Sequence, residues 1–403
     1  MFENGFATRT ESAKKCIFPV IHQLDALGDA AYGGRFYDGD MNVLHVNVLP
    51  TARMNLAADL RTDFLTGEAL TDFDKHIQFH VVKYTKAQME AVQQVVDAEI
   101  MGKLGIVSSV YDVKTNKLCL GIEDDTAEAK AEIIHTLESL GYADADMIEF
   151  VKGYKVDEGG VADFSDSPVD VSAGVPDRAL DAVARAGLSV QPGSWLGHGT
   201  ALTSITGITS LCTGFLYNNT PGFLTCGHGA TVGEKIFYQP VPSSGRYPSN
   251  LWSYSTSNLT EIGTIAAASY KSGDAYDYAS ILRTNSSANM SNKNFAGGTV
   301  DGDSGIPEVG EALAMCGCAD GALFGTCTAN SYTVTMSSGV VKTNTITMDK
   351  DTTSGSSGGC LAYLDGATNK VNLTGLLLGS NGFASHYTKY GLVKSRFNLT
   401  TVY

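Results

Sequence analysis

The chain has 403 residues, of which 43% are hydrophobic and 18% are charged, and its formal net charge at pH 7 is −15. This composition is typical of a globular protein, and the length allows two domains of ordinary size. No apolar run approaches the roughly 18 residues of a membrane-spanning helix. Residues 1–15 lack the apolar core of a signal peptide.

The acidic charge is concentrated in the first half of the chain. Residues 1–190 carry 31 Asp and Glu against 17 Lys and Arg, whereas residues 191–403 carry 12 against 11. Nucleic acids and anionic membrane surfaces favour clustered Lys and Arg, so neither is an expected partner. The change in composition also predicts a domain boundary near residue 190.

Residue patterns in the first half predict an α+β domain, because helical spacing of apolar residues is mixed with short runs of strand-forming residues. The expected elements are a strand at 43–49, a strand at 77–84, a helix at 86–104, a hairpin at 106–122, a helix at 126–140 and a strand at 147–151. A polar, poorly periodic run follows and is typical of a linker. We therefore divide the chain into a domain at 1–155, a linker at 156–189 and a second domain at 190–403.

The second half is rich in Gly, Ser, Thr and Asn between short apolar strands, which predicts an antiparallel β protein. Residues 210–227 are expected to form a hairpin that turns at 218–222. Eight cysteines, six of them in this half, indicate an oxidising compartment. Spacing about the turns predicts disulfides between Cys212 and Cys226 and between Cys318 and Cys327. Cys316 with Cys360 is a third pairing that does not rest on such a spacing, and Cys16 and Cys119 stay unassigned. No metal is expected, because the cysteine spacing does not fit a zinc site.

One glycine-rich stretch carries the strongest chemical signal. Residues 353–361 read Thr-Ser-Gly-Ser-Ser-Gly-Gly-Cys-Leu and place Ser357 between Gly355 and Gly358. A serine nucleophile needs a base to take its proton and backbone N–H groups to meet the oxyanion that it creates. Glycines on either side of the serine allow the tight turn in which neighbouring backbone N–H groups point toward one oxygen atom. Taken alone, the stretch is more typical of a flexible Gly/Ser loop than of a nucleophile turn.

Two further stretches supply the missing groups. Residues 223–229, Phe-Leu-Thr-Cys-Gly-His-Gly, carry His228, and residues 277–282, Asp-Tyr-Ala-Ser-Ile-Leu, begin with Asp277. In the order His228, Asp277, Ser357 these motifs resemble the chymotrypsin-like serine proteases, especially the secreted bacterial branch of streptogrisins and alpha-lytic protease. Subtilisins and α/β-hydrolases have other chain orders.

The resemblance implies a fold and a mechanism. Residues 190–403 would form an all-β antiparallel double β-barrel, and the protein would be a secreted serine endopeptidase that needs no cofactor. His228 would act as general base, Asp277 would orient it, and the N–H groups of Gly355 and Ser357 would form the oxyanion hole. The first half resembles the propeptide regions of some family members. It would be an intramolecular chaperone or inhibitor docked on the protease domain, or an accessory domain without chemistry.

The same resemblance suggests a primary substrate pocket. Asp351 would lie at its floor and favour cleavage after Lys or Arg, although a surface position is the commoner fate of an aspartate. The strand beside the substrate would contain Leu378 and Ser380, and Ser385 would belong to the far wall. Leu378 stands where the family normally has a serine that supports the triad aspartate.

Three stretches of the sequence resemble parts of catalytic motifs that compete with this interpretation. Residues 355–359 also fit the nucleophile elbow of α/β-hydrolases, but too little chain follows them for that fold. Residues 302–305, Gly-Asp-Ser-Gly, are interpreted as a turn, and His198 as a loop histidine. A catalytically inactive binding module and an esterase with the same triad remain alternative functions.

Overall fold

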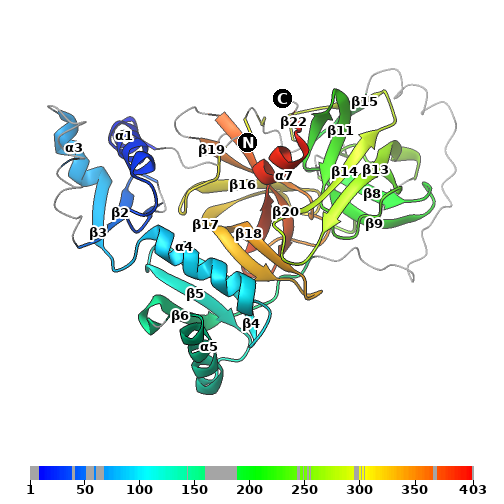
Figure 1. The fold of residues 1–403 in the computed structure, drawn as a ribbon. Coiled ribbons are helices and arrows are strands. Elements are labelled where there is room, and N and C mark those ends of the chain that lie inside the picture. Colours follow the sequence, from blue (N-terminus) through cyan, green and yellow to red (C-terminus); the bar gives the residue numbers. More distant parts are fainter. Residues whose placement is uncertain are drawn as a thin grey trace.

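The fold is described from a computed structural model. It describes residues 9–38, 41–50, 59, 68–142, 144–158, 188–242, 246–247, 249–251, 254, 256–294, 299–300, 302–303, 305–365 and 370–401. In this part of the chain, four β-sheets of three, eight, two and nine strands account for the strand pairing (Figure 1). No helix among these residues is long and apolar enough to cross a membrane.

The first elements form a small α/β unit. It consists of α1 (Glu11–Leu27), β1 (Arg35–Tyr37), β2 (Leu44–Val48), α3 (Glu68–His76) and β3 (Ile77–Val81). The expected strands at 43–49 and 77–84 are thus confirmed as β2 and β3. Helix α1 was not predicted, although Ala13, Ile17, Val20 and Leu24 recur at helical spacing and are buried against this sheet. Pro19 lies inside the helix and obscures the pattern.

The next elements follow the predictions closely. They are α4 (Lys86–Val95), which continues as the π-helix η1 (Val96–Ile100), β4 (Ile106–Asp112), β5 (Lys117–Ile122), α5 (Ala127–Ser139), the 3₁₀ turn η2 (Ala145–Met147) and β6 (Ile148–Lys152). Helix α4 starts where Thr85 and Gln88 form a reciprocal capping box. The helix expected at 86–104 therefore begins as predicted but ends at Ile100.

An eight-stranded antiparallel sheet holds most of the chain between residues 195 and 283. Its order is β22 (Thr400–Thr401), β10 (Thr213–Tyr217), β11 (Thr220–Thr225), β14 (Asp277–Arg283), β13 (Thr260–Tyr270), β12 (Lys235–Tyr238), β8 (Trp195–Gly199) and β9 (Ile205–Ser210). The β10–β11 hairpin turns at Asn218 and Asn219, which both have positive φ, as predicted for this segment. A short parallel pair, β7 (Leu188–Val190) and β15 (Ala288–Met290), lies beside it.

The nine-stranded sheet draws on both halves of the chain. Its order is β16 (Ala312–Gly317), β19 (Cys360–Asp365), β20 (Lys370–Ser380), β21 (Ser385–Lys389), β18 (Val341–Met348), β17 (Gly321–Thr335), β4, β5 and β6, and β16 also pairs with β17. The link between the halves is the antiparallel pairing of β4 with β17, in which Ser109 faces Thr333. One continuous sheet therefore crosses the expected boundary at residues 156–189, of which 159–187 lie outside the described residues. A mostly β architecture is confirmed, and the double β-barrel remains a prediction.

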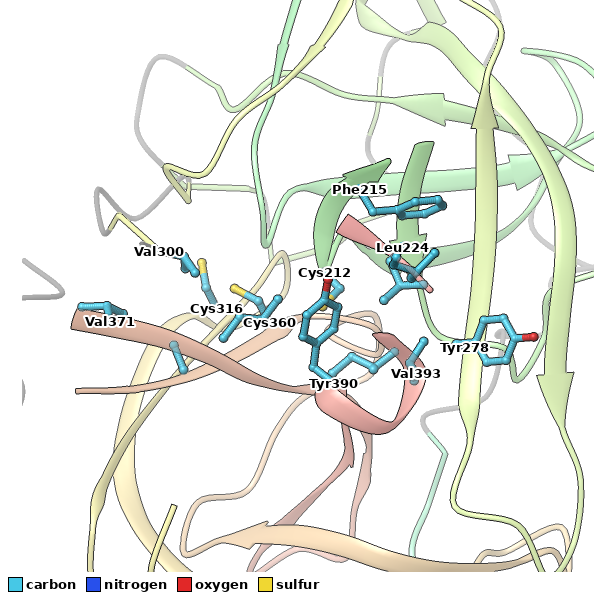
Figure 2. Close-up of a cluster of buried hydrophobic side chains, with 14 of the residues drawn as sticks. Cys212, Phe215, Leu224, Tyr278, Val300, Cys316, Cys360, Val371, Tyr390 and Val393 are labelled. Atoms are coloured by element: carbon cyan, nitrogen blue, oxygen red, sulfur yellow. The ribbon is translucent and has the colours of Figure 1, made fainter. Parts of the chain in front are cut away.

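A buried apolar cluster joins the two large sheets (Figure 2). Phe215 and Leu224 come from the eight-stranded sheet, Cys316 and Cys360 from the nine-stranded sheet, and Tyr390 from α7 (Tyr390–Phe397). All five side chains are at most 2% exposed. This shared core fixes the ends of β11 and β19 relative to each other, and these ends carry the candidate site.

The predicted disulfides are wrong. All eight cysteines lie in the described part of the chain, and none of them forms a disulfide there. In the β10–β11 hairpin Thr213 faces Leu224, so Cys212 and Cys226 are not register partners. In the β16–β17 hairpin Cys318 lies at the turn, whereas the N–H of Cys327 pairs far along the strand with the carbonyl of Glu311 (2.8 Å). Without these pairs, the cysteines do not indicate an oxidising compartment.

The third cysteine pair differs from the other two. Cys316 and Cys360 are direct partners across β16 and β19, as a disulfide would require, yet both remain thiols. Both side chains are completely buried.

A carboxylate is enclosed where β4 meets β17. Asp97 of η1 accepts hydrogen bonds from the hydroxyls of Ser109 and of Thr333, the latter at 2.7 Å. Burial raises the pKa of Asp97 to about 6, which outweighs the lowering by the two hydroxyls. The same side chain thus contacts both halves of the chain.

We expect Asp97→Asn to stabilise the fold at pH 7.5 by about 1–2 kcal/mol. A pKa raised on folding gives stability that is present at low pH and is lost as the pH rises through about 6, because the charged form is poorly solvated in the fold. The melting temperature of the wild type, relative to that of the variant, should fall as the pH rises from about 4 to about 6. Glu132→Gln, on the exposed face of α5, is the matched control. Parallel melting profiles for wild type and Asp97→Asn would contradict the prediction.

Candidate active site

His228 and Asp277 meet because β11 and β14 are antiparallel neighbours, with Thr225 facing Ala279. The chain leaves β11 three residues before the histidine, and the aspartate is the first residue of β14. His228 Nδ1 lies 2.6 Å from Asp277 Oδ2, while Asp277 Oδ1 accepts from the backbone N–H groups of Gly227 (2.6 Å) and His228 (2.8 Å). The carboxylate is therefore fully occupied in holding the histidine.

The electrostatics of the pair follow from this contact. Burial alone lowers the pKa of the His228 imidazole, but the adjacent Asp277 carboxylate raises it well above its ordinary value, with a smaller contribution from Cys226. The short bond to the carboxylate places the proton on Nδ1 and leaves Nε2 as the basic nitrogen. His228 Nε2 is buried and has no hydrogen-bond partner among the described residues.

Ser357 sits in a tight turn before β19 that is pinned to the eight-stranded sheet. The N–H of Ser210 donates to the Ser357 carbonyl (2.7 Å), and the hydroxyl of Ser210 donates to the Gly355 carbonyl (3.0 Å). Gly358 has φ of 81° and approaches Thr225 so closely that a Cβ would lie 2.4 Å from its hydroxyl oxygen. Only glycine allows the turn to pack against the end of β11, next to His228.

The serine hydroxyl is engaged by another part of the chain. Ser357 Oγ donates to the carbonyl oxygen of Glu158, 3.0 Å away. The N–H groups of Gly355 and Ser357, the expected oxyanion hole, have no acceptor among the described residues. The Glu158 carbonyl thus meets the hydroxyl and not the oxyanion donors. Ser357 itself is only 4% exposed.

Residues 156–158 lie in extended form across the front of this site. The N–H of Asp157 donates to the carbonyl of Ser380 (2.7 Å), and the Ser380 N–H donates back (3.0 Å). Val156 forms a parallel bridge at the end of β17: its N–H donates to the carbonyl of Thr335 (3.0 Å), and its carbonyl accepts from the N–H of Ser337 (2.7 Å). Both sets of bonds use only the backbone, as in peptide recognition by strand addition. We call these three residues the groove segment.

The side chains of Val156 and Glu158 in the groove segment also contact the second half of the chain. Val156 is fully buried among Val334, Met336 and Leu378. The Glu158 carboxylate accepts hydrogen bonds from the hydroxyls of Tyr270, Ser337 (2.6 Å) and Ser338. The segment was assigned to the start of the linker from the sequence, and its position in the site was not predicted.

The predicted pocket residues lie at different depths. Ser380 lines a cavity of about 40 Å³ together with Asp157 and Ser357. Asp351 is exposed and accepts from the N–H of Gly382 (3.1 Å). Leu378 is in the apolar cluster around Val156. Ser385 is fully buried, and its hydroxyl lies 2.8 Å from that of Tyr387.

The competing motifs are placed elsewhere. The loop assignment of His198 is wrong, because the residue lies in β8, where it is 1% exposed and its Nε2 is 2.7 Å from the Thr209 hydroxyl. Asp303 of the Gly-Asp-Ser-Gly sequence forms an ion pair with Lys394 (2.7 Å), and Ser304 lies outside the described residues. Within the described ranges, no group of three or more His, Cys, Asp and Glu side chains could hold a metal ion.

Tyr270 is a site residue that the sequence did not reveal. Its ring contacts that of His228 edge to face, with centroids 5.6 Å apart, while its hydroxyl reaches the Glu158 carboxylate. It is the last residue of β13, whose register places it opposite Asp277. A tyrosine at the end of a strand carries no chemical motif, so only the pairing of β13 with β14 could have indicated its position.

Comparison with known proteins gives distant likenesses in structure only. No family model and no curated protein matches the chain. Among solved structures, a Nocardiopsis protease and Thermobifida fusca protease A are each 19% identical, and a Cellulomonas bogoriensis chymotrypsin is 21% identical, all at a TM-score of 0.40. Each match covers 53% of this chain and 98–100% of the other. Likenesses of this size do not place the chain in a family.

Proposed function

We propose that this protein is a serine endopeptidase in which Ser357 is the nucleophile, His228 the general base and Asp277 the residue that orients the base. The observation that carries the proposal is the buried His228–Asp277 contact, 2.6 Å long, at the end of β11, against which the glycine turn of Ser357 packs. A carboxylate in this position selects the imidazole tautomer with a free Nε2 and stabilises the imidazolium formed when the serine proton is taken. The Ser357 hydroxyl is hydrogen-bonded to the Glu158 carbonyl and not to His228 Nε2.

The chemical steps follow from these roles. His228 Nε2 takes the Ser357 proton as Oγ attacks a peptide carbonyl, and the N–H groups of Gly355 and Ser357 stabilise the negative oxygen. The imidazolium then gives its proton to the leaving amine, and an acyl group stays on Ser357 until water, activated by His228, releases it. Every proton transfer in this sequence uses side chains of the chain itself.

The first half of the chain would hold the enzyme in an inhibited state. The groove segment covers Ser357, and its Glu158 carbonyl accepts a hydrogen bond from the hydroxyl that His228 would have to deprotonate during attack. The carbonyl does not meet the oxyanion donors, so this contact is unproductive. Peptide or protein substrates would bind only after the segment leaves.

Labelling with a fluorophosphonate tests the proposal. The reagent should modify Ser357 of the intact chain slowly and should react faster after protease treatment has cut the chain between residues 159 and 187. Ser357→Ala should abolish labelling, and Ser354→Ala, in the same turn, should leave it in place. Peptide mass analysis locates the modified residue. An unlabelled Ser357 in both intact and cut chain would contradict the proposal and favour a binding module.

A further inference from the structure

The carboxylate of Glu158 lies in a site built for a carboxylate. Three hydroxyl groups converge on its two oxygens: Tyr270 and Ser338 donate to Oε1, and Ser337 donates to Oε2 at 2.6 Å. The residue is 8% exposed. Burial raises its pKa, but the three hydrogen bonds outweigh burial and hold the pKa of Glu158 below its ordinary value. The surroundings therefore favour the charged side chain.

All three donors belong to the half of the chain that carries the candidate triad. Tyr270 ends β13, and Ser337 and Ser338 follow β17. Tyr270 also contacts the His228 ring. The donors would thus stay beside the site after the groove segment has left, and they would face the corresponding side chain of any peptide that replaced it.

The position of that side chain is fixed by the backbone. Asp157 exchanges two hydrogen bonds with Ser380, and the next residue brings its carbonyl to Ser357. A substrate that pairs with Ser380 in the same register must present its next side chain to the three hydroxyls. The groove is then selective at this residue, which we call the carboxylate position.

We infer that Tyr270, Ser337 and Ser338 form a side-chain subsite that selects glutamate at the carboxylate position, and that the protease acts on peptides carrying an acidic residue there. The inference rests on the proposed function for its link to catalysis. It differs from the sequence expectation of a preference for Lys or Arg, which was based on Asp351, an exposed residue. Hydrogen bonds to a charged group are about twice as strong as neutral ones, so glutamate is favoured over glutamine.

Peptide binding to an inactive chain tests the subsite without any chemistry. The protein is the full chain with Glu158→Ala and Ser357→Ala, and the probes are fluorescent, amidated peptides of residues 153–158. One probe, Gly-Tyr-Lys-Val-Asn-Glu, keeps the glutamate, and the other, Gly-Tyr-Lys-Val-Asp-Gln, has the same net charge without it. Fluorescence anisotropy should show that the first binds about tenfold more tightly. Adding Ser337→Ala and Ser338→Ala should remove most of the difference.

A second measurement uses the intact groove segment. In the otherwise unchanged chain, Glu158→Gln should speed hydrogen exchange in residues 153–158 about tenfold. Glu123→Gln is the matched control, because Glu123 forms only an exposed ion pair with Lys155 (3.2 Å) just before the segment. Equal affinity for the two peptides would overturn the inference. Absence of binding by both, together with unchanged exchange in Glu158→Gln, would overturn it as well.

The outcome is separable from that of the proposed function. Failure of the proposed function appears as an unlabelled Ser357, whereas the binding and exchange experiments do not depend on a reactive serine. If Ser357 is labelled and the two peptides bind with equal affinity, the result supports the proposed endopeptidase function and contradicts the proposed preference for glutamate.

Discussion

Asparagine in place of Asp277 is expected to lower the rate of Ser357 acylation by about 10⁴-fold, the loss typical of a triad that is left with the wrong imidazole tautomer. The amide can still fill the space, but it cannot accept from Nδ1–H and from the N–H groups of Gly227 and His228 in the way the carboxylate does. The measurement is the rate of fluorophosphonate labelling of the cut chain.

The pH profile provides a second check on the same variant. The wild type holds the pKa of His228 well above its ordinary value through Asp277, so the base is lost as the pH falls through that raised pKa. In Asp277→Asn the remaining labelling should persist to lower pH. Asp274→Asn is the matched control. Asp274 lies three residues before Asp277 in the chain, and its carboxylate pairs with Lys342 (2.8 Å). An Asp277→Asn rate within tenfold of the control would contradict the assigned role.

Alanine at position 379 is expected to displace the groove segment and raise the labelling rate of the intact chain about 10- to 100-fold. A Cβ at Gly379 would lie 2.2 Å from the carbonyl oxygen of Asp157 and 3.1 Å from the Cα of Glu158. Each of the three closest atoms belongs to the groove segment, so the clash spares the rest of the fold. A small reagent would then reach Ser357 freely.

Peptide cleavage should respond differently from labelling in this variant. A substrate must approach the same strand as the segment, so Gly379→Ala should not hydrolyse peptides faster even though Ser357 is exposed. Gly391→Ala in α7, where a Cβ meets nothing within 4 Å, is the control and should match the wild type. An intact-chain labelling rate that Gly379→Ala leaves unchanged would argue against the groove segment as the inhibitor.

The parts of the fold that were predicted correctly are those determined by residues close together in the sequence. The hairpin at 106–122, the helix at 126–140 and the turn at Asn218 and Asn219 depend on neighbouring residues and came out close to their expected bounds. The residues proposed for the triad were likewise found from short motifs. The contact between His228 and Asp277 depends on the pairing of β11 with β14, and two runs of apolar residues do not specify that pairing on their own. The hydrogen bond of the Ser357 hydroxyl to Glu158 was not predicted.

Features that depend on long-range backbone contacts were missed. The pairings of Cys212 with Cys226 and of Cys318 with Cys327 failed because strand register decides which side chains face each other, and spacing about a turn does not fix the register. The groove segment was missed for a related reason. Asp157 is held through N–H and carbonyl groups that every residue except proline possesses, so no side-chain pattern marks it.

The backbone pairing of β4 with β17 affects which amino-acid substitutions the seam between the two halves of the chain can tolerate during evolution. The strands are aligned by backbone register, so the seam tolerates many side-chain substitutions, apart from Ser109 and Thr333, whose hydroxyls bind Asp97. High salt should not separate β4 from β17, because backbone hydrogen bonds are not screened as surface charges are, whereas denaturant should separate the two strands. Substitutions that keep both strands extended can therefore accumulate on either side of the seam while β4 and β17 stay aligned. Among related chains, we expect the seam to vary in sequence, except around Asp97, while its register stays constant.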